Sequence, residues 1–178
     1  MNVSWSHCVI RVRDIDALAS FYCDMLGFRI SDQAPVVPDG PKIVFMSGAS
    51  SDHHQMALIA VRGPEEASSL EHNAFRVETL GEVKEMAKRL EADDRVATFS
   101  PVTHGNAISV YFADPEGNGI EVFCDSPWHV RQPQLRPWDP SKSEEEVLAF
   151  VEAEFRGEPE FAPMAEYRAK KAADFGES

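Results

Sequence analysis

An internal repeat with a period of about 65 residues is the feature that most constrains the fold. The stretches "HCVIRVRDIDALASFYCDMLGF" and "HNAFRVETLGEVKEMAKRL" each open with a histidine, His7 or His72, and continue to an apolar-Arg-Val triplet. Each then reaches a helix-capping residue seven positions after the histidine, Asp14 or Thr79. A chain that repeats itself in this way is expected to fold as two copies of one supersecondary unit.

Each copy predicts one strand, one helix and then three strands. Residues 7–12 and 72–77 alternate as strands, and apolar residues recur at helical spacing directly after both. Short β-rich runs follow at 28–33, 42–47 and 55–61 in the first copy and at 95–100, 107–112 and 119–123 in the second. Neither small sheet can bury both faces alone. We therefore predict an α+β fold in which two βαβββ modules, about 4–62 and 70–126, curl mixed sheets around a shared metal cavity.

The chain after residue 126 departs from the repeat. We expect residues 1–126 to form one domain of paired modules, and residues 127–178 to form a loop and a helical C-terminal extension. A first helix is predicted from about Lys142 to Phe155, with a capping box and an apolar stripe, and a second through "APMAEYRAKKAADF". The capping box is Ser143 with Glu146, and the stripe is Leu148, Val151 and Phe155. The stripe either packs on the chain's own sheet or serves as a dimer contact or a lid.

The stretch "VYFADPEGNGIEV" predicts a hairpin that carries ionisable groups. The Asp-Pro-Glu-Gly sequence at 114–117 has turn chemistry, and it places Tyr111 opposite Glu121 on one face of the sheet. If the modules are related by a pseudo-two-fold axis, His7, His72 and Glu121 converge on one cavity. Alignment of the two last strands places Leu58 at the position equivalent to Glu121, so the predicted site has three ligands and an apolar fourth position.

Two imidazoles and one carboxylate form a facial triad that suits Fe(II) and leaves coordination positions open for substrate and O₂. Mn²⁺ or Zn²⁺ would accept the same ligands. His53, His54 and His104 stand at strand ends, where they could serve as acid–base groups, and Tyr111 could donate a hydrogen bond to a substrate oxygen. A lone histidine at a strand start is more often a cap or a core residue, but the repeat-equivalent pair favours a metal site. His129 falls outside this pattern.

The amino-acid composition limits which partners and which cellular location are expected for the chain. The formal net charge is −13, from 17 basic and 30 acidic residues, which disfavours nucleic acid. No apolar run approaches the ~18 residues of a membrane span, and no signal peptide is visible. Three cysteines, an odd number at spacings unlike a zinc site, favour reduced thiols and a cytoplasmic location. A homodimer or higher homo-oligomer is the default expectation, and the residues indicate no organic cofactor.

With these motifs in view, residues 4–126 resemble the vicinal oxygen chelate superfamily of glyoxalases, bleomycin resistance proteins and type I extradiol dioxygenases. "HHQMALIAV", "EHNAFRVET" and "HGNAISVYFADPEGNGIEVF" are most similar to extradiol ring-cleavage dioxygenases. The resemblance implies that the three predicted ligands bind Fe(II), that His54 is the acid–base residue, and that Tyr111 and His104 contact the substrate. It also implies a small aromatic diol, opened with O₂ in the catabolism of aromatic compounds.

Three alternatives remain at this point. A Mn²⁺-dependent fosfomycin-type thiol transferase would use the same ligands but has threonine where this chain has Val9. A glyoxalase-like lyase would need a fourth protein ligand near the position of Leu58. A metal-free small-molecule binding protein would have no need of His7, His72 and Glu121 together.

Overall fold

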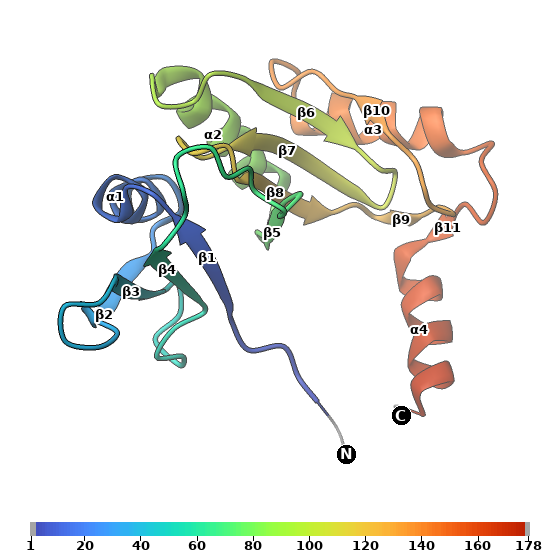
Figure 1. Ribbon diagram of the computed structural model, residues 1–178. Helices are drawn as coiled ribbons and strands as arrows, with labels where there is room; N and C mark the ends of the chain where they lie inside the picture. Colours follow the sequence, from blue (N-terminus) through green and yellow to red (C-terminus); the bar gives the residue numbers. More distant parts are fainter. Residues whose placement is uncertain (1–2, 177–178) are drawn as a thin grey trace. The chain divides into compact units, whose positions relative to one another are not determined.

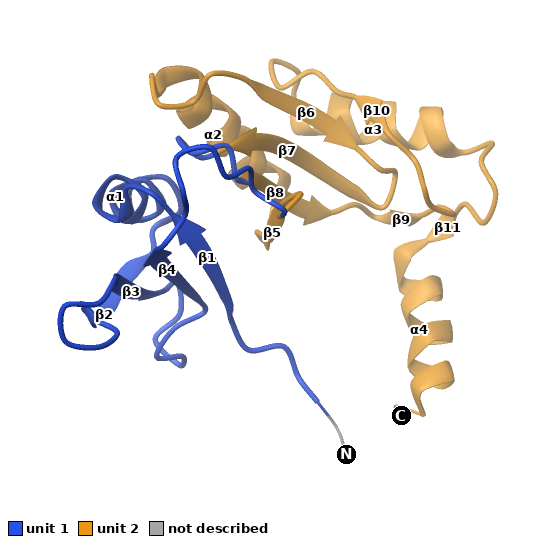
Figure 2. Cartoon of the chain, in the orientation of Figure 1, with its two compact units in different colours: residues 1–69, 114–118 blue, residues 70–113, 119–178 orange. Residues whose placement is uncertain are grey.

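The structure, a computed structural model, describes residues 3–176, and the chain forms two compact units (Figure 2). Unit 1 contains the residues up to Ser69 together with Asp114–Asn118. Unit 2 contains Leu70–Ala113 and the chain from Gly119 onward. Each unit carries one of the two predicted modules, and the C-terminal extension belongs to unit 2. The division of the chain into domains at residue 126 stays a prediction.

Unit 1 is built on a four-stranded sheet in the order β1-β4-β3-β2 (Figure 1). Helix α1 begins directly after β1 because the Asp14 side chain caps it, accepting a hydrogen bond from the Ala17 amide at 3.0 Å. The helix ends at Gly27, which has a left-handed φ of 73°. β1 and β4 are parallel, and the other neighbours are antiparallel. The elements are β1 (Cys8–Val12), α1 (Ile15–Leu26), β2 (Arg29–Pro35), β3 (Lys42–Ser47) and β4 (Met56–Ala60).

Unit 2 repeats this topology, because its strands lie in the order β10-β6-β7-β8-β5, again with the first strand of the module parallel to the last. Helix α2 has the predicted capping box of Thr79 and Glu82, and it packs on β6, β7 and β8. The elements of the module are β5 (Asn73–Arg76), α2 (Leu80–Ala92), β6 (Phe99–Thr103), β7 (Ala107–Ala113) and β8 (Gly119–Asp125). The predicted pair of βαβββ modules is therefore confirmed.

The extension adds two further helices to unit 2. It consists of β9 (Trp128–His129), β10 (Arg136–Pro137), α3 (Glu144–Phe155), β11 (Ala162–Pro163) and α4 (Met164–Phe175). The capping box of α3 is confirmed, but its buried stripe is Val147, Val151 and Phe155, whereas Leu148 is only half-buried. An i, i+4, i+8 row therefore forms the buried face of α3. None of the helices within residues 3–176 is long and apolar enough to cross a membrane.

The predicted strand at 95–100 lies too early in the sequence. β6 begins only at Phe99, because the preceding residues form a turn after α2. The Asp93 side chain accepts hydrogen bonds from the Arg95 backbone amide and guanidinium at 2.9 Å, and the Val96 amide donates to the Asp93 carbonyl. An aspartate that bonds to the backbone two residues onward favours a turn over a strand.

The strand registers also correct the equivalence of Leu58 with Glu121. Val9 pairs with Ala57, and Ala74 pairs with Glu121. Because Val9 and Ala74 each lie two positions after the module's histidine, Ala57 is the true counterpart of Glu121. Leu58 is one residue further on, points to the opposite face and is fully buried. The counterpart remains apolar, so the expectation of an apolar fourth position is unaffected.

A polar network in unit 1 surrounds the start of α1. The Glu116 carboxylate accepts hydrogen bonds from the Arg13 and Asp14 amides, both at 2.7 Å, and approaches the Arg62 guanidinium at 3.5 Å. The Arg62 and Glu116 side chains are only 5% and 7% exposed. A carboxylate in this place stabilises the positive end of the helix dipole as well as a buried cation.

Replacing Glu116 with alanine is expected to lower the free energy of unfolding by about 2–4 kcal/mol, because it leaves two backbone donors without their acceptor and removes a carboxylate that neutralises the buried Arg62 guanidinium. Urea denaturation followed by circular dichroism measures this loss. The matched control is Glu65→Ala, at an exposed position that makes none of these hydrogen bonds. An equal loss in both variants would contradict the role assigned to Glu116.

Candidate active site

The hairpin of β7 and β8 places its ionisable groups as predicted. Tyr111 pairs directly with Glu121 across the two strands. Val110 and Val122 point to the opposite face and are buried in the core. Strand alternation therefore puts Tyr111 and Glu121 on the face away from α2, where Glu121 is only 7% exposed. A carboxylate buried to this extent needs hydrogen bonds or a cation.

His72 lies beside Glu121, with its Nε2 atom 3.4 Å from Glu121 Oε2. The other ring nitrogen, Nδ1, bonds to the carboxylate of Glu71. Because a carboxylate only accepts, Nδ1 carries a proton, and in the neutral ring the Nε2 lone pair then faces the oxygen of Glu121. Two acceptors in this position repel one another unless a cation or a proton lies between them.

Ser109 fixes the other oxygen of Glu121. Its hydroxyl is fully buried and donates to Glu121 Oε1 at 2.6 Å. This leaves Oε2 as the oxygen directed at His72. Ser109 is not among the residues predicted from the sequence, although its position two residues before Tyr111 on the same strand face is a usable signal.

Tyr111 and His104 form a hydrogen-bonded pair next to the carboxylate. The Tyr111 hydroxyl lies 2.9 Å from His104 Nε2, and His104 Nε2 lies 3.9 Å from Glu121 Oε1. Burial raises the pKa of Tyr111 above its ordinary value, and the neighbouring Glu121 carboxylate raises it further. The phenol therefore stays protonated near neutral pH and can donate a hydrogen bond.

The remaining predicted residues, His7 and His54, lie together in unit 1. Their ring centroids are 4.4 Å apart, and Ser6 Oγ is 3.1 Å from His7 Nδ1. His54 Nδ1 contacts His53 Nδ1 at 3.0 Å, and His53 Nε2 contacts the Asp32 carboxylate at 3.1 Å.

These contacts determine which ring nitrogen of His53 and of His54 carries a proton. The Asp32 carboxylate requires a proton on His53 Nε2, so a neutral His53 accepts from His54 Nδ1. The Nε2 atom of His54 is then left as a free base. Desolvation lowers the pKa of His54, and the imidazoles of His7 and His53 lower it further, which favours this neutral form.

The structure therefore groups the predicted residues into two sets. His72, Glu121, Tyr111 and His104 lie together in unit 2, and His7 and His54 lie together in unit 1. Within either unit taken alone, the described residues contain no group of three His, Cys, Asp or Glu side chains arranged to hold a metal ion. The union of His7 with His72 and Glu121 around one ion stays a prediction.

Gly119, at the start of β8, sets the place of His72. A Cβ atom at this position would lie 1.9 Å from the carbonyl oxygen of Glu71 and 3.1 Å from the Cα atom of His72. Only glycine allows the two backbones to approach so closely. The backbone of His72 therefore lies directly against the strand that carries Glu121.

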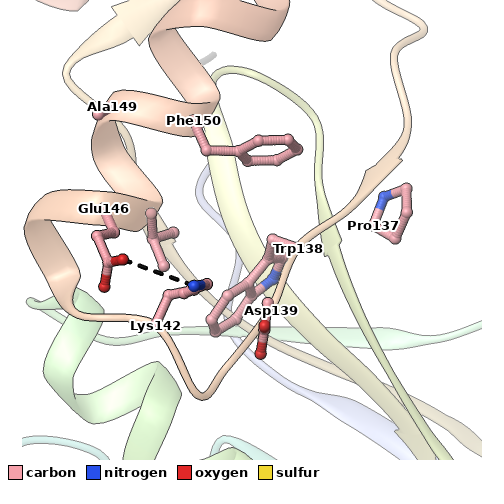
Figure 3. A pocket seen from close by; sticks show the side chains of 8 residues that line it. Pro137, Trp138, Asp139, Lys142, Glu146, Ala149 and Phe150 are labelled. Carbon is pink, nitrogen blue, oxygen red and sulfur yellow. Dashed lines mark ion pairs between the residues drawn. The ribbon is translucent and has the colours of Figure 1, made fainter.

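Unit 2 also has a cavity of about 640 Å³ whose lining contains none of the predicted site residues. Figure 3 shows Phe150 of α3 and Trp138, which follows β10, among its walls, with Lys142 paired to Glu146 nearby. Trp138 is buried, and its indole Nε1 donates to the Ser109 carbonyl oxygen at 2.9 Å. The cavity wall is thus bonded to the strand that carries Tyr111.

Comparison with known proteins places the chain among relatives of defined chemistry. The family model described as "Glyoxalase/Bleomycin resistance protein/Dioxygenase superfamily" matches residues 4–122. Biphenyl-2,3-diol 1,2-dioxygenase 3 of Rhodococcus globerulus is 32% identical over 127 residues, which is 68% of this chain and 63% of the relative. Metapyrocatechase of Pseudomonas sp. (strain CF600) is 26% identical and is aligned over 76% of this chain but only 44% of its own length. The chain thus spans less than two thirds of these relatives.

Solved structures share the fold at lower identity. The fosfomycin resistance protein FosX of Listeria monocytogenes, in complex with Mn(II) and sulfate, superposes with a TM-score of 0.56 at 19% identity, over 71% of this chain and 95% of that one. A glyoxylase/bleomycin resistance protein/dioxygenase domain from Frankia sp. EAN1pec reaches 0.60, also at 19% identity, over 72% and 96%. At this identity the likeness establishes the fold alone.

Proposed function

Because the chain belongs to the glyoxalase/bleomycin resistance protein/dioxygenase superfamily, we propose that it is an Fe(II)-dependent extradiol dioxygenase, which opens the ring of a catechol-type substrate with O₂. The names of its relatives support this reaction class. The observation that carries the proposal is the arrangement of His72 and Glu121, whose acceptor atoms face one another at 3.4 Å.

His72 and Glu121 fit a divalent cation by their chemistry. An unprotonated imidazole nitrogen and a carboxylate oxygen are both ligands of Fe(II), and the Glu71 carboxylate orients the His72 ring as partners of metal-bound histidines commonly do. We propose His7 as the third ligand, on the strength of its repeat-equivalent position. The alternative is that a proton, in place of a metal ion, lies between His72 and Glu121. Metal titration distinguishes these two possibilities.

Bound Fe(II) would supply the electron transfer between the diol and O₂. The chain's own residues would bind the diol and move its protons. Tyr111, protonated at neutral pH, would donate a hydrogen bond to a substrate oxygen, and it would donate to His104 Nε2 in the absence of substrate. His54, with its free Nε2, would take a proton from the substrate hydroxyl and return it as the ring opens.

The test is anaerobic reconstitution of the protein with Fe(II), followed by exposure to air and a panel of catechols while the absorbance of the yellow ring-fission product is recorded. We expect one Fe(II) per chain and colour with at least one monocyclic or biaryl catechol. Reconstitution with Mn²⁺ in parallel addresses the metal preference.

A protein that binds one divalent ion per chain but colours no catechol would refute the dioxygenase proposal. Thiol addition to fosfomycin in the presence of Mn²⁺ would then identify the transferase alternative. Val9, which stands where that reaction type has threonine, opposes this alternative. A protein that binds no divalent ion at all would indicate that a proton, and not a metal ion, lies between His72 and Glu121.

A further inference from the structure

His104 has a partner on each of its ring nitrogens, and one of them comes from the C-terminal extension. Its Nδ1 atom lies 2.6 Å from the main-chain carbonyl oxygen of Gln134, and its Nε2 atom lies 2.9 Å from the Tyr111 hydroxyl. A carbonyl oxygen can only accept, so the proton is on Nδ1. In the neutral ring Nε2 is then an acceptor, and the Tyr111 hydroxyl donates to it.

A single side chain, that of Gln132, holds both backbones that form this contact. Its amide nitrogen donates to the His104 carbonyl oxygen at 2.8 Å, and its amide oxygen accepts from the Gln134 backbone amide at 3.0 Å. The same nitrogen also reaches Asn106 Oδ1 at 3.2 Å. Gln132 thus acts as a clamp between the turn that carries His104 and the segment that supplies the carbonyl.

Close packing supports the clamp. Gly105, next to His104, has a φ of 81°, and a Cβ atom there would lie 2.4 Å from Val130 and 3.0 Å from the ring of Phe155. Both of these neighbours are fully buried residues of the extension. The turn after β6 therefore lies tightly against the extension, and its position depends on that segment.

We propose that Gln132 is a positioning residue, which holds His104 as the Nδ1–H tautomer through the Gln134 carbonyl, so that Nε2 accepts a hydrogen bond from the Tyr111 hydroxyl. The inference deepens the proposed function and rests on it for its catalytic meaning. It also gives the extension a task at the site, since residues 132–134 fix the state of a substrate-binding histidine. A histidine held as one tautomer loses less orientational freedom when substrate arrives.

Nitrogen-15 NMR of the histidine rings in the metal-free protein tests the proposal directly, because the two ring nitrogens of each tautomer differ widely in chemical shift. In the unmodified protein we expect His104 Nδ1 to have the shift of a protonated nitrogen and Nε2 that of an unprotonated one. In Gln132→Ala the two shifts should move toward each other, as both tautomers become populated. Gln132→Glu, which keeps the acceptor but loses the donor, should move them in the same direction.

The matched control is Leu135→Ala, which truncates an exposed side chain directly after Gln134 and keeps the main-chain carbonyl of Gln134, and the His104 shifts should not change in it. With Fe(II) and a catechol, kcat of Gln132→Ala should fall by about fivefold to tenfold, as expected for the weakening of one hydrogen bond. Circular dichroism confirms that each variant is folded.

A His104 ring protonated on Nε2 in the unmodified protein would overturn the proposal. It would equally be overturned if the His104 shifts were the same in the Gln132 variants as in the unmodified protein. The NMR measurement needs neither metal nor substrate. If the tautomer shifts in the variants while no catechol is cleaved, the positioning role stands and only the proposed function fails.

Discussion

Glu121→Ala is expected to abolish tight binding of Fe(II) and, with it, ring cleavage. The variant removes the only carboxylate among the three proposed ligands and leaves the hydroxyl of Ser109 without its acceptor. Loss of a residue that merely orients a ligand weakens metal binding by about 10- to 100-fold, so loss of the ligand itself should exceed this. Anaerobic calorimetric titration with Fe(II), or with Mn²⁺ as an air-stable substitute, measures the change.

Two further variants make this result specific. His72→Ala should have the same effect as Glu121→Ala, because it removes the facing ligand. Glu85→Ala, on the exposed face of α2, removes a carboxylate of the same size that pairs with Arg89 at 3.9 Å, and it should bind metal as the unmodified protein does. Retention of metal affinity in Glu121→Ala would refute the proposed ligand set.

His54→Ala is expected to lower kcat by about 10²- to 10⁴-fold while metal affinity is retained. The reason is that His54 supplies a free Nε2 base but is not a proposed ligand. The chain of contacts through His53 to Asp32 places the proton of the neutral ring on Nδ1, which leaves Nε2 unprotonated. Steady-state turnover of the Fe(II)-loaded protein, together with a metal titration of the same sample, separates the two effects.

Gln33→Ala is the matched control, since Gln33 is exposed and adjacent to Asp32, and its turnover should be normal. His53→Ala should cause a smaller loss than His54→Ala, because it disturbs the orientation of the base without removing it. If His54→Ala turned over substrate at the full rate, the acid–base role would have to be given to another residue. Loss of metal binding in the same variant would instead make His54 a ligand.

Much of the fold could be predicted because each copy of the repeat carries short-range sequence signals for its helix and its turns. The capping residues Asp14 and Thr79, the left-handed Gly27 and the turn before Gly117 each depend on neighbours within a few positions of the chain. The pairing of Tyr111 with Glu121 followed from the turn between them. The start of β6 was missed because an aspartate turn competes with a strand there, and the two signals have similar strength.

The supports of the candidate site could not be predicted in the same way. The contact of His104 with the Gln134 carbonyl joins positions 30 residues apart through a main-chain atom, and no side-chain type in the sequence identifies such an acceptor. The bond between Ser109 and Glu121 is a diagonal contact that depends on strand twist. Leu58 was predicted as the counterpart of Glu121 in place of Ala57 because a one-residue error in register is invisible when both residues are apolar.

The glycine at position 119 has a consequence for how tolerance to substitution would be distributed over this chain. Any other residue there would push the carbonyl of Glu71, and with it His72, away from β8, although glycine itself offers no ligand atom and no proton. A survey of all single substitutions would therefore rank this position beside the ligands. Intolerance at position 119 would show that the position has no room for a side chain. The residues that act chemically would differ, because they would also not tolerate replacement by residues of similar size.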